Sequence, residues 1–474
     1  MTTLVLDQGG HSSRAFVFDA DGRALRQAQR SVGATRPAPG RVEQDPEELV
    51  WSLREAIDEV GTEGDVTRAG LATQRSSIVC WDRTSGEALT PVLSWQDTRA
   101  AARLAALEPR RSEIRRRTGL FPNAHYGATK LAWCLEQVPE VRRAAGDGRL
   151  AMGPLASFLV FRLTRERSFV VDPANASRTL LLNLESQAWD AALLQAFDVS
   201  REHLPEILPT RASFGTLETP GGAVPLELVQ GDQPAALFAF GPPRSDTAYV
   251  NLGTGAFVQR PVEGELPPLE RLLASVVFSE GERSRCVVEG TVNGAGSALR
   301  WLAQREGASE IEGELASWLE EVDQPALFLN GVSGLGSPFW TPLTPRFVEG
   351  EDGSLAVRAT GVLESIVFLV VANLVAMNEA LAVPRRLVVS GGLANLDGLC
   401  TRLATLVRVP VERSALREAT AHGLSHLLTG VVSPDAAPSL NTVFRPAHDD
   451  TGQRLRARYD RWRAELARAL TSET

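Results

Sequence analysis

Two turns rich in glycine and hydroxyl residues have the composition that binds phosphate. QGGHSS (8–13) follows the apolar run TLVLD and precedes RAFVFD, and LGTG (252–255) lies between TAYVN and AFVQRPV. Glycines let a backbone approach a ligand closely, and successive N–H groups with the Ser12 and Ser13 hydroxyls can bind phosphate oxygens. One such turn alone is usually an ordinary hairpin, but two in corresponding places of one chain favour phosphate binding.

Charged residues suited to phosphate chemistry stand beside the first turn. Asp7 ends the first apolar run and offers the hard oxygen ligand that hydrated Mg²⁺ uses. Arg14 can neutralise a transferring phosphoryl group. In LVQGDQPAALFAFG (228–241), Asp232 and Gln233 lie between a turn and an apolar helix. Asp232 either caps that helix or faces a cleft as a general base.

The elements that must position these residues occur twice along the chain. The first half reads strand, turn, strand, an Asp-Gly hairpin, a third strand, a helix at 46–60 capped by Asp45, and a strand at 67–74. The second half repeats strand, turn and strand at 247–262, then has an apolar helix at 354–381 and a strand, Gly-Gly turn and helix at 384–407. This pattern predicts a duplicated α/β protein with domains 1–242 and 243–474, followed by a charged amphipathic helix at 450–470 that packs on the surface.

Composition narrows the class of protein. The chain has 474 residues, 43% of them hydrophobic, and a net charge of −9, which disfavours a nucleic-acid or anionic-membrane partner. Four scattered cysteines and a start without a basic region followed by an apolar run predict a cytoplasmic protein without a secretory signal. The apolar segment 366–377 is expected to be too short to span a bilayer and to form a buried helix. A homo-oligomer stays open.

Two further features weigh against other kinds of site. Lys130, in YGATKLAW, is the chain's single lysine and lies outside the P-loop pattern, so any ATP site uses neither a P-loop nor a protein-kinase scaffold. His422 and His426 stand four apart on an expected helix, a spacing that can hold a metal ion. The sequence suggests no third ligand, which leaves metal binding there as the weaker interpretation.

Motifs spread along nearly the whole chain resemble one family. They include LDQGGHSSRAFVFD, ATQRSSIVCWD, SWQDTRAA, GATKLAW, GDQPAALF, LGTGAFV and LVVSGG. In this colinear order the chain resembles the FGGY carbohydrate kinases, and within them the glycerol kinases. The resemblance implies an α/β fold of two actin-like (ribonuclease-H-like) domains with a cleft between them. The sugar or polyol would bind the first domain and ATP the second.

The resemblance also implies an activity and a set of site residues. The activity is transfer of the γ-phosphate of ATP, with Mg²⁺, to a hydroxyl of a small polyol or sugar such as glycerol or a related ketose, with Asp232 as general base. The implied substrate residues are Arg75, Ser76, Trp95, His125, Asp232, Gln233 and Phe257. The implied nucleotide residues are Gly10, His11, Ser12, Ser13, Arg14, Gly253, Thr254, Gly296, Gly391 and Gly392, with Asp7 at the metal.

The chain departs from the glycerol-kinase pattern at several of these positions. Ser76 stands where glycerol kinases carry a glutamate, and His125 where they carry a tyrosine, for which Tyr126 could compensate. Gly10 and His11 replace two threonines. Loss of a carboxylate acceptor changes hydroxyl recognition by about 1–3 kcal/mol. The acceptor therefore stays open, and two alternatives remain: a catalytically silent or regulatory sugar- and ATP-binding relative, or an ATPase that transfers phosphate to no acceptor.

Overall fold

The chain divides into two compact units in a computed structural model, which describes residues 2–62, 66–268, 270–281, 283–308, 311–437 and 441–472. Unit 1 contains Met1–Pro243, Ala274–Cys286 and Leu416–Ala437, and unit 2 contains Arg244–Leu273, Val287–Ala415 and Pro438–Thr474. Both units are discontinuous in sequence. The single boundary after residue 242 therefore stays a proposal for the order of domains along the chain.

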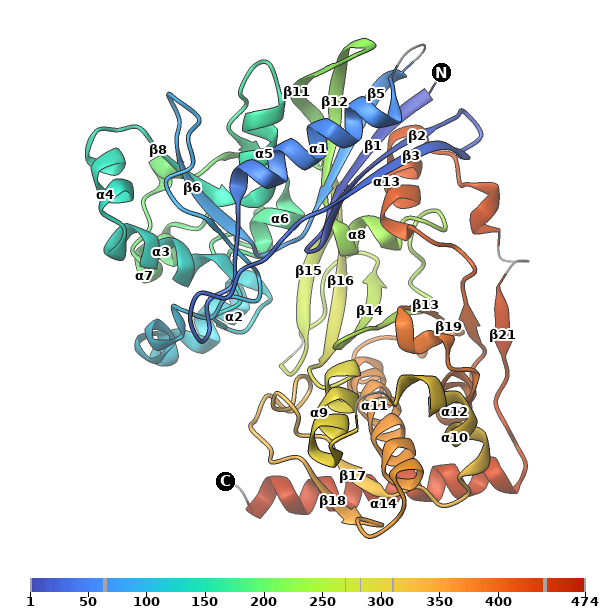
Figure 1. The fold of residues 1–474 in the computed structure, drawn as a ribbon. Coiled ribbons are helices and arrows are strands. Elements are labelled where there is room, and N and C mark those ends of the chain that lie inside the picture. The colour runs from blue at the N-terminus through green and yellow to red at the C-terminus, as the bar shows by residue number, and fades with distance from the viewer. Residues whose placement is uncertain are drawn as a thin grey trace. The chain divides into compact units, whose positions relative to one another are not determined.

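Unit 1 is built on a six-stranded mixed sheet in the order β11-β12-β5-β1-β2-β3 (Figure 1). Strands β1, β5 and β12 run parallel, whereas β2 and β3 continue from β1 as antiparallel neighbours and β11 is antiparallel to β12. Nearly every residue of β1 and β2 is buried, as expected for central strands covered on both faces. The bounds are β1 Thr2–Gln8, β2 Ser12–Phe18, β3 Ala24–Ser31, β5 Val66–Thr73, β11 Arg211–Thr219 and β12 Gly222–Gly231.

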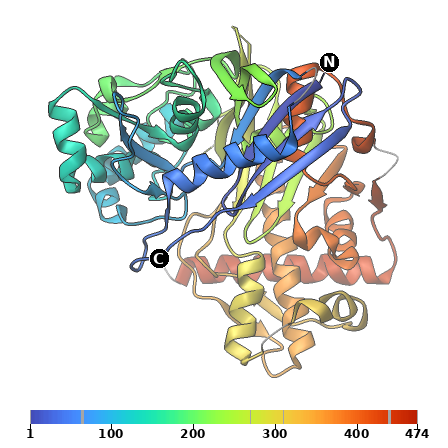
Figure 2. The same cartoon turned by 45° about the horizontal axis from the view of Figure 1, so that its top comes forward.

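Helix α1 (Pro46–Val60) packs on β2 and β3, and in Figure 2 it runs across these strands. The Asp45 carboxylate accepts the backbone N–H groups of Glu47 and Glu48, and Pro46 occupies the first turn. Both features were predicted from the sequence, because a cap depends only on neighbouring residues.

The opposite face of the sheet carries two helices from distant parts of the chain. Helix α13 (Ala419–Thr429) contacts β1, β5 and β12 and packs closely on α8 (Asp232–Leu237). A side chain at Gly423 would overlap the carbonyl oxygen of Ala235 in α8. The glycine therefore sets how near the two helices approach, and so where α8 begins.

A second, smaller sheet in unit 1 has predicted site residues just outside its strands, with Ser76 before β6 and Trp95 after β7. Its order is β4-β7-β6-β8, and helix α3 packs on β6 and β8. The bounds are β4 Glu43–Gln44, β6 Ile78–Asp82, β7 Val92–Leu93, β8 Leu150–Pro154 and α3 Gly127–Gln137. The other unit 1 elements are α2 Arg111–Thr118, α4 Pro139–Gly146, α5 Leu155–Leu163, α6 Pro173–Ser177, α7 Ala191–Phe197, β9 Val170–Val171 and β10 Glu206–Ile207.

Unit 2 repeats the strand order of unit 1, which confirms the predicted duplication. Five of its strands have the order β14-β13-β19-β20-β21, with β13 antiparallel to β14 and parallel to β19, and β19 parallel to β20. The run β14-β13-β19-β20 therefore matches β2-β1-β5-β12. The bounds are β13 Thr247–Leu252, β14 Ala256–Val262, β19 Arg386–Ser390, β20 Val411–Arg413 and β21 Thr442–Phe444, and a separate pair of strands is β17 Leu327–Leu329 and β18 Arg346–Glu349. Strand β15 (Leu273–Glu280), except its first residue, and the first four residues of β16 (Arg283–Val292) belong to the unit 1 range Ala274–Cys286.

Helix α11 (Leu355–Asn378) forms the centre of unit 2. It is 24 residues long and apolar enough to cross a membrane, but 89% of its most apolar window is buried inside the protein. The prediction of a buried helix is confirmed. The expectation that it is too short to span a bilayer is wrong, because the helix extends well before the apolar run at 366–377.

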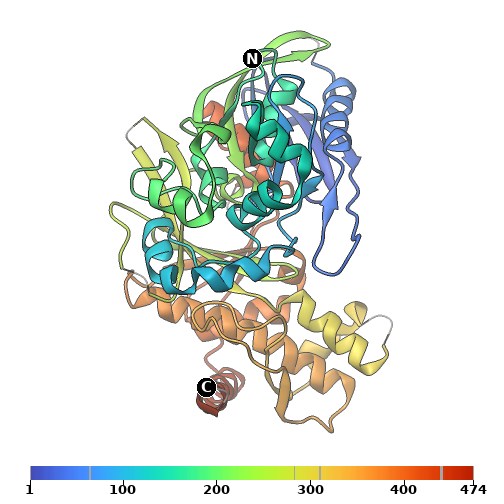
Figure 3. The ribbon, with the colours of Figure 1, turned by 90° about the vertical axis from the view of Figure 1, so that its left-hand side faces the viewer.

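The C-terminal helix α14 (Asp450–Ser472), seen nearly end-on in Figure 3, is a packing helix of unit 2, as predicted. The Trp462 side chain is buried, and its indole N–H donates to the carbonyl of Phe328 at 3.0 Å. The remaining helices of this unit are α9 Gly296–Glu306, α10 Leu315–Glu321 and α12 Asp397–Val407.

Replacing Gly423 by alanine is expected to destabilise unit 1, because the new methyl group must push α13 away from α8. Overpacking of this kind costs about 1–3 kcal/mol of unfolding free energy. Urea unfolding followed by circular dichroism measures it. Gly146→Ala is the matched control, because a Cβ there has open space around it. Equal stability of the two variants would contradict the close contact.

Candidate active site

Three parallel strands end side by side in unit 1. Gln8 of β1 pairs with Thr73 of β5, and Thr73 pairs with Gly231 of β12. The segments that follow, beginning at Gly9, Gln74 and Asp232, therefore leave the sheet at the same edge. Ligands of open α/β sheets bind at this carboxyl edge. The register thus brings together residues that lie more than two hundred positions apart in the sequence.

Asp232, Gln233 and Arg75 form the first cluster at this edge. A guanidinium N–H of Arg75 donates to Gln233 Oε1 at 2.7 Å. A side chain at Gly231 would overlap the Arg75 stem, so the glycine allows Arg75 to lie across the end of β12. The N-cap of α8 is Gly231, so Asp232 is not the capping residue, and its Oδ1 accepts the backbone N–H of Gln233 at 2.7 Å. Burial raises the pKa of Asp232, although Arg75 partly opposes this.

Asp7, Arg14 and Glu418 form the second cluster. Asp7 and Arg14 are cross-strand partners on β1 and β2, with Nη1 to Oδ2 at 3.9 Å, and Arg14 also donates to the Glu418 carboxylate. Burial, reinforced by the negative charges of Asp232 and Glu418, raises the pKa of Asp7 to about 7, against the opposing effect of Arg14. A carboxyl group in this position gains from a nearby cation, which would favour its ionised form.

A buried amide network connects the first phosphate turn to the segment after β5. Gln74 Nε2 donates to Gln8 Oε1 at 3.2 Å and to Gln44 Oε1 at 2.9 Å, and Gln44 Nε2 donates to the carbonyl of Gly10 at 3.1 Å. Ser77 Oγ donates to Gln74 Oε1 and accepts the backbone N–H of Trp95. These contacts fix the turn relative to Trp95, and sequence analysis did not identify these glutamines as site residues.

Trp95, His125 and Ser76 lie together beside these clusters. Trp95 is 42% exposed, so its ring is not part of the hydrophobic core. Its ring centroid lies 6.5 Å from that of His125, whose Nδ1 is 2.9 Å from the Trp95 carbonyl oxygen. Ser76 adopts a left-handed backbone conformation, with φ of 66°. The neighbouring Tyr126 stacks on the guanidinium of Arg178. The positive charge of Arg178 also opposes the rise in the pKa of Asp232.

In unit 2, two further glycine-containing turns converge on the second predicted phosphate turn. The carbonyl of Gly253 accepts the N–H of Gly296 at 2.9 Å, and that of Thr254 accepts the N–H of Ser297 at 3.0 Å. Gly391, with φ of 92°, leaves room for the Leu252 carbonyl. These contacts place Gly253, Thr254, Gly296, Gly391 and the adjacent Gly392 in one region, with the Thr254 side chain exposed.

Some predicted residues lie apart from these groups. The Ser13 hydroxyl is buried and accepts a hydrogen bond from Ser52 of α1, which argues against its role as a phosphate ligand, because alternation along β2 turns it away from the Arg14 side. Ser12 begins β2 and is nearly buried, and His11 is exposed in the turn. Phe257 belongs to unit 2, where it pairs with Asn251, so its role as a wall of the acceptor pocket stays a prediction.

Helix α13 and the residue before it supply two further residues that the sequence analysis missed. Glu418 precedes it in a left-handed conformation, and Thr420 Oγ1 donates to the Asp232 carbonyl oxygen at 3.3 Å. His422 and His426 are buried, with the His422 ring packed edge-on against Phe18. Among the residues that the structure describes, no group of three or more His, Cys, Asp or Glu side chains could hold a metal ion, which leaves the histidine-pair interpretation without support.

Asp7→Asn is expected to change the pH dependence of stability. Because the folded-state pKa of Asp7 is raised from 3.8 to about 7, the folded protein holds this proton more tightly than the unfolded chain, and wild-type stability falls as pH rises between these values. Asparagine removes this effect. The unfolding free energy of the variant minus that of wild type should therefore increase from pH 4.5 to pH 8. Urea unfolding without magnesium or nucleotide, carried out at both pH values, measures this difference.

The exposed Asp21→Asn variant is the control for the chemical substitution itself. A difference between Asp7→Asn and wild type that is the same at both pH values would contradict the raised pKa.

Comparison with known proteins identifies the family. Residues 2–238 match the N-terminal domain, and residues 248–452 the C-terminal domain, of the FGGY family of carbohydrate kinases. The glycerol kinase of Alkalilimnicola ehrlichii is 36% identical over 460 residues, covering 93% of this chain and 92% of that protein. That of Trichlorobacter lovleyi is 37% identical over 443 residues, covering 90% and 88%.

Solved structures confirm the expected fold of two actin-like domains. Plasmodium falciparum glycerol kinase with ADP superposes with a TM-score of 0.89 at 22% identity, covering 99% of this chain and 98% of that one. A xylulose kinase from Rhodospirillum rubrum gives 0.85 at 19% identity, covering 98% of both chains. The chain therefore belongs to the FGGY family of carbohydrate kinases and is an ATP-dependent carbohydrate or polyol kinase.

Proposed function

We propose that the protein transfers the γ-phosphate of Mg²⁺-ATP to a hydroxyl of a small polyol or ketose, with Asp232 as general base. The observation that carries this proposal is the convergence of Asp7, Arg75 and Asp232 at the carboxyl edge of three parallel strands. Phosphoryl transfer needs positioning, charge neutralisation and a carboxylate to accept the hydroxyl proton. An ATPase without an acceptor would have no need of the Asp232, Gln233 and Arg75 cluster.

Asp232 has the environment of a base. Its Oδ1 accepts the Gln233 N–H, so we assign the incoming proton to Oδ2. Burial raises its pKa, which strengthens the carboxylate as a base. The acceptor oxygen would attack the γ-phosphorus, the bond to the bridging oxygen of ADP would break, and the hydroxyl proton would pass to Asp232. Arg14 would neutralise charge on the transferring group.

We assign the remaining ligands by unit. Asp7, whose buried carboxyl gains from a nearby cation, would hold hydrated Mg²⁺, which when bound supplies charge neutralisation to the phosphates. In unit 2, the nucleotide would bind to the region formed by Gly253, Thr254, Gly296, Gly391 and Gly392. The four cysteines are free thiols, which supports a reducing cytoplasm as the location.

The acceptor pocket would be walled by Trp95 and bind hydroxyls through Arg75 and Gln233. Ser76 is smaller than the glutamate of glycerol kinases and carries no charge. The pocket would therefore have more room and would lack the carboxylate that accepts a hydrogen bond from a substrate hydroxyl. These changes favour a polyol longer than glycerol, or a ketose, over glycerol itself. Among the relatives named above, the Rhodospirillum rubrum protein is named for a ketose, whereas the others are named for glycerol.

We expect a panel of substrates to identify the acceptor. The panel contains glycerol, erythritol, longer alditols, pentuloses and hexoses, and ADP release from Mg²⁺-ATP is measured with each. One polyol or ketose should exceed glycerol in kcat/KM by about tenfold or more, which corresponds to the hydrogen bonding that changes at Ser76. Preference for glycerol would contradict the role given to Ser76. Absence of turnover across the panel with ATP binding intact would favour the catalytically silent alternative.

Asp232→Asn is expected to lower kcat about 10²- to 10⁴-fold, the usual contribution of a general base, while the dissociation constants for acceptor and ATP change little. Steady-state kinetics and calorimetric binding separate the two effects. Asp147→Asn is the matched control, since that carboxylate is exposed and pairs with Arg149 on the surface of unit 1. A variant with wild-type kcat would show that Asp232 is not the base.

A further inference from the structure

The single lysine of the chain is completely buried beneath the predicted acceptor pocket. Lys130 lies on α3, and its Nζ is 2.8 Å from the carbonyl oxygen of Ser76, 2.9 Å from that of Ser94 and 2.9 Å from that of His125. These carbonyls belong to three separate segments: the one after β5, the one after β7, and the one before α3. One ammonium group therefore joins all three.

The chemistry of this contact explains why the residue is lysine. An ammonium has three N–H donors in a compact tetrahedral arrangement, which suits three convergent carbonyls, whereas a guanidinium is a planar fork. The other 48 of the 49 basic residues are arginine. A chain that uses arginine everywhere else retains lysine at the one position where three backbone oxygens converge.

Each segment joined by Lys130 carries a predicted acceptor residue. Ser76 is itself one, in a left-handed conformation, and Ser94 directly precedes Trp95. His125 is the third, and its ring also contacts the Trp95 carbonyl. We propose that Lys130 is a positioning residue of the acceptor site, which holds Ser76, Trp95 and His125 in place and thereby sets the affinity for the acceptor. This inference rests on the proposed role of those three residues.

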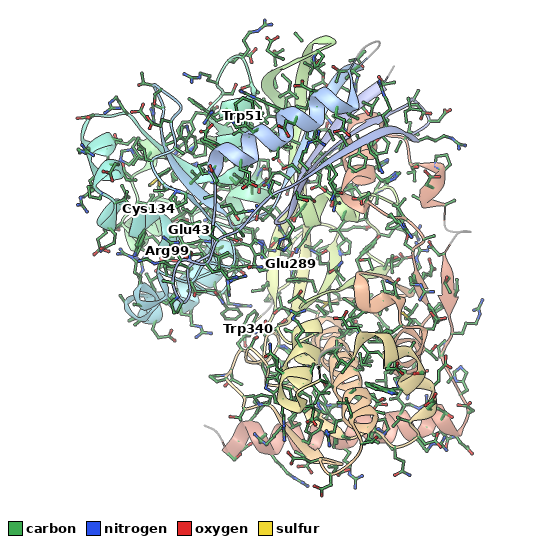
Figure 4. The ribbon with its side chains drawn as sticks, in the orientation of Figure 1. Glu43, Trp51, Arg99, Cys134, Glu289 and Trp340 are labelled. Atoms are coloured by element: carbon green, nitrogen blue, oxygen red, sulfur yellow. The ribbon has the colours of Figure 1, made fainter. Side chains whose placement is uncertain are left out.

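The charged groups around Lys130 make its contacts sensitive to pH. Burial lowers the pKa of Lys130 to about 7, Asp97 and Cys134 oppose this, and Arg99 adds to it. Asp97 is itself paired with Arg99 at 2.7 Å, and Arg99 also binds Glu43 at 2.6 Å. Figure 4 labels Glu43, Arg99 and Cys134 in this part of unit 1. Loss of the ammonium proton as pH rises leaves two N–H donors for three carbonyls.

Lys130→Met tests the proposal, because methionine keeps an unbranched side chain and removes every donor. Hydrogen exchange followed by mass spectrometry reports on the segments around residues 76, 94–95 and 125, and steady-state kinetics reports the KM of the acceptor and of ATP. Arg260→Met is the matched control. Arg260 is also a buried cation and donates to the carbonyls of Ser245 and Ala382, but it lies in unit 2.

We expect Lys130→Met to accelerate exchange in the three segments and to raise the acceptor KM about tenfold or more, with the KM for ATP within about twofold of wild type. Arg260→Met should do neither. The ratio of acceptor KM between Lys130→Met and wild type should be largest below pH 7 and fall above it, because only the wild type loses a donor there. Titration of Asp232 is common to both proteins and cancels in this ratio. The pKa of His125 is lowered mainly by burial and also by the Lys130 charge, so the fall of the ratio is measured between pH 7 and pH 9, above the titration of His125 in both proteins.

Unchanged exchange and acceptor KM in Lys130→Met, equal effects in Arg260→Met, or a ratio independent of pH would each overturn the proposal. If Lys130→Met does not fold, Lys130→Arg is measured instead. Its planar fork should also accelerate exchange in the three segments, and wild-type exchange would overturn the requirement for three donors. If the wild type phosphorylates no acceptor, the proposed function fails, while hydrogen exchange still decides whether Lys130 positions these segments.

Discussion

The register of three parallel strands is the constraint on which the candidate site in unit 1 depends. Because Gln8, Thr73 and Gly231 stand side by side in β1, β5 and β12, the residues that follow must emerge together. A shift of one residue in any strand would turn its side chains to the other face of the sheet. The glycines at 231 and 423 preserve this arrangement, one by leaving room for Arg75 and the other by letting α13 hold α8 in place.

That convergence brings buried carboxyl groups close together, and nearby arginines partly offset the repulsion between them. Asp7 and Asp232 are acidic groups near enough to raise the pKa of Asp7, and Glu418 adds a third negative charge. Arg14 is placed between Asp7 and Glu418, and Arg75 and Arg178 act on Asp232. The arginines compensate only part of the cost of burial, since both aspartates retain raised pKa values. A site in this state gains from binding a cation and can accept a proton, which are two of the requirements of phosphoryl transfer.

Sequence analysis predicted the parts of this arrangement that depend on neighbouring residues. The Asp45 cap, the hairpin from β2 to β3 and the repeated strand order follow from short-range patterns, and they are confirmed. The resemblance supplied Asp232 and Arg75, which spacing alone could not connect. Glu418 and the carbonyl contacts of Lys130 were missed, because α13 returns to unit 1 from far along the chain and because a buried ammonium leaves no periodic pattern.

The two copies of the duplicated strand order share a scaffold but differ in the residues at corresponding positions. Asp7 and Asn251 occupy corresponding places, each at the end of the first central strand and before a glycine turn. In unit 1 this position carries a charge and is surrounded by arginines and carboxylates. In unit 2 it is a neutral amide that donates to Ser390, and its neighbours are glycines whose backbones pack closely. The same arrangement of strands is therefore charged in one copy and neutral and close-packed in the other, and under the proposed function the first copy would serve proton and metal chemistry and the second would bind the nucleotide.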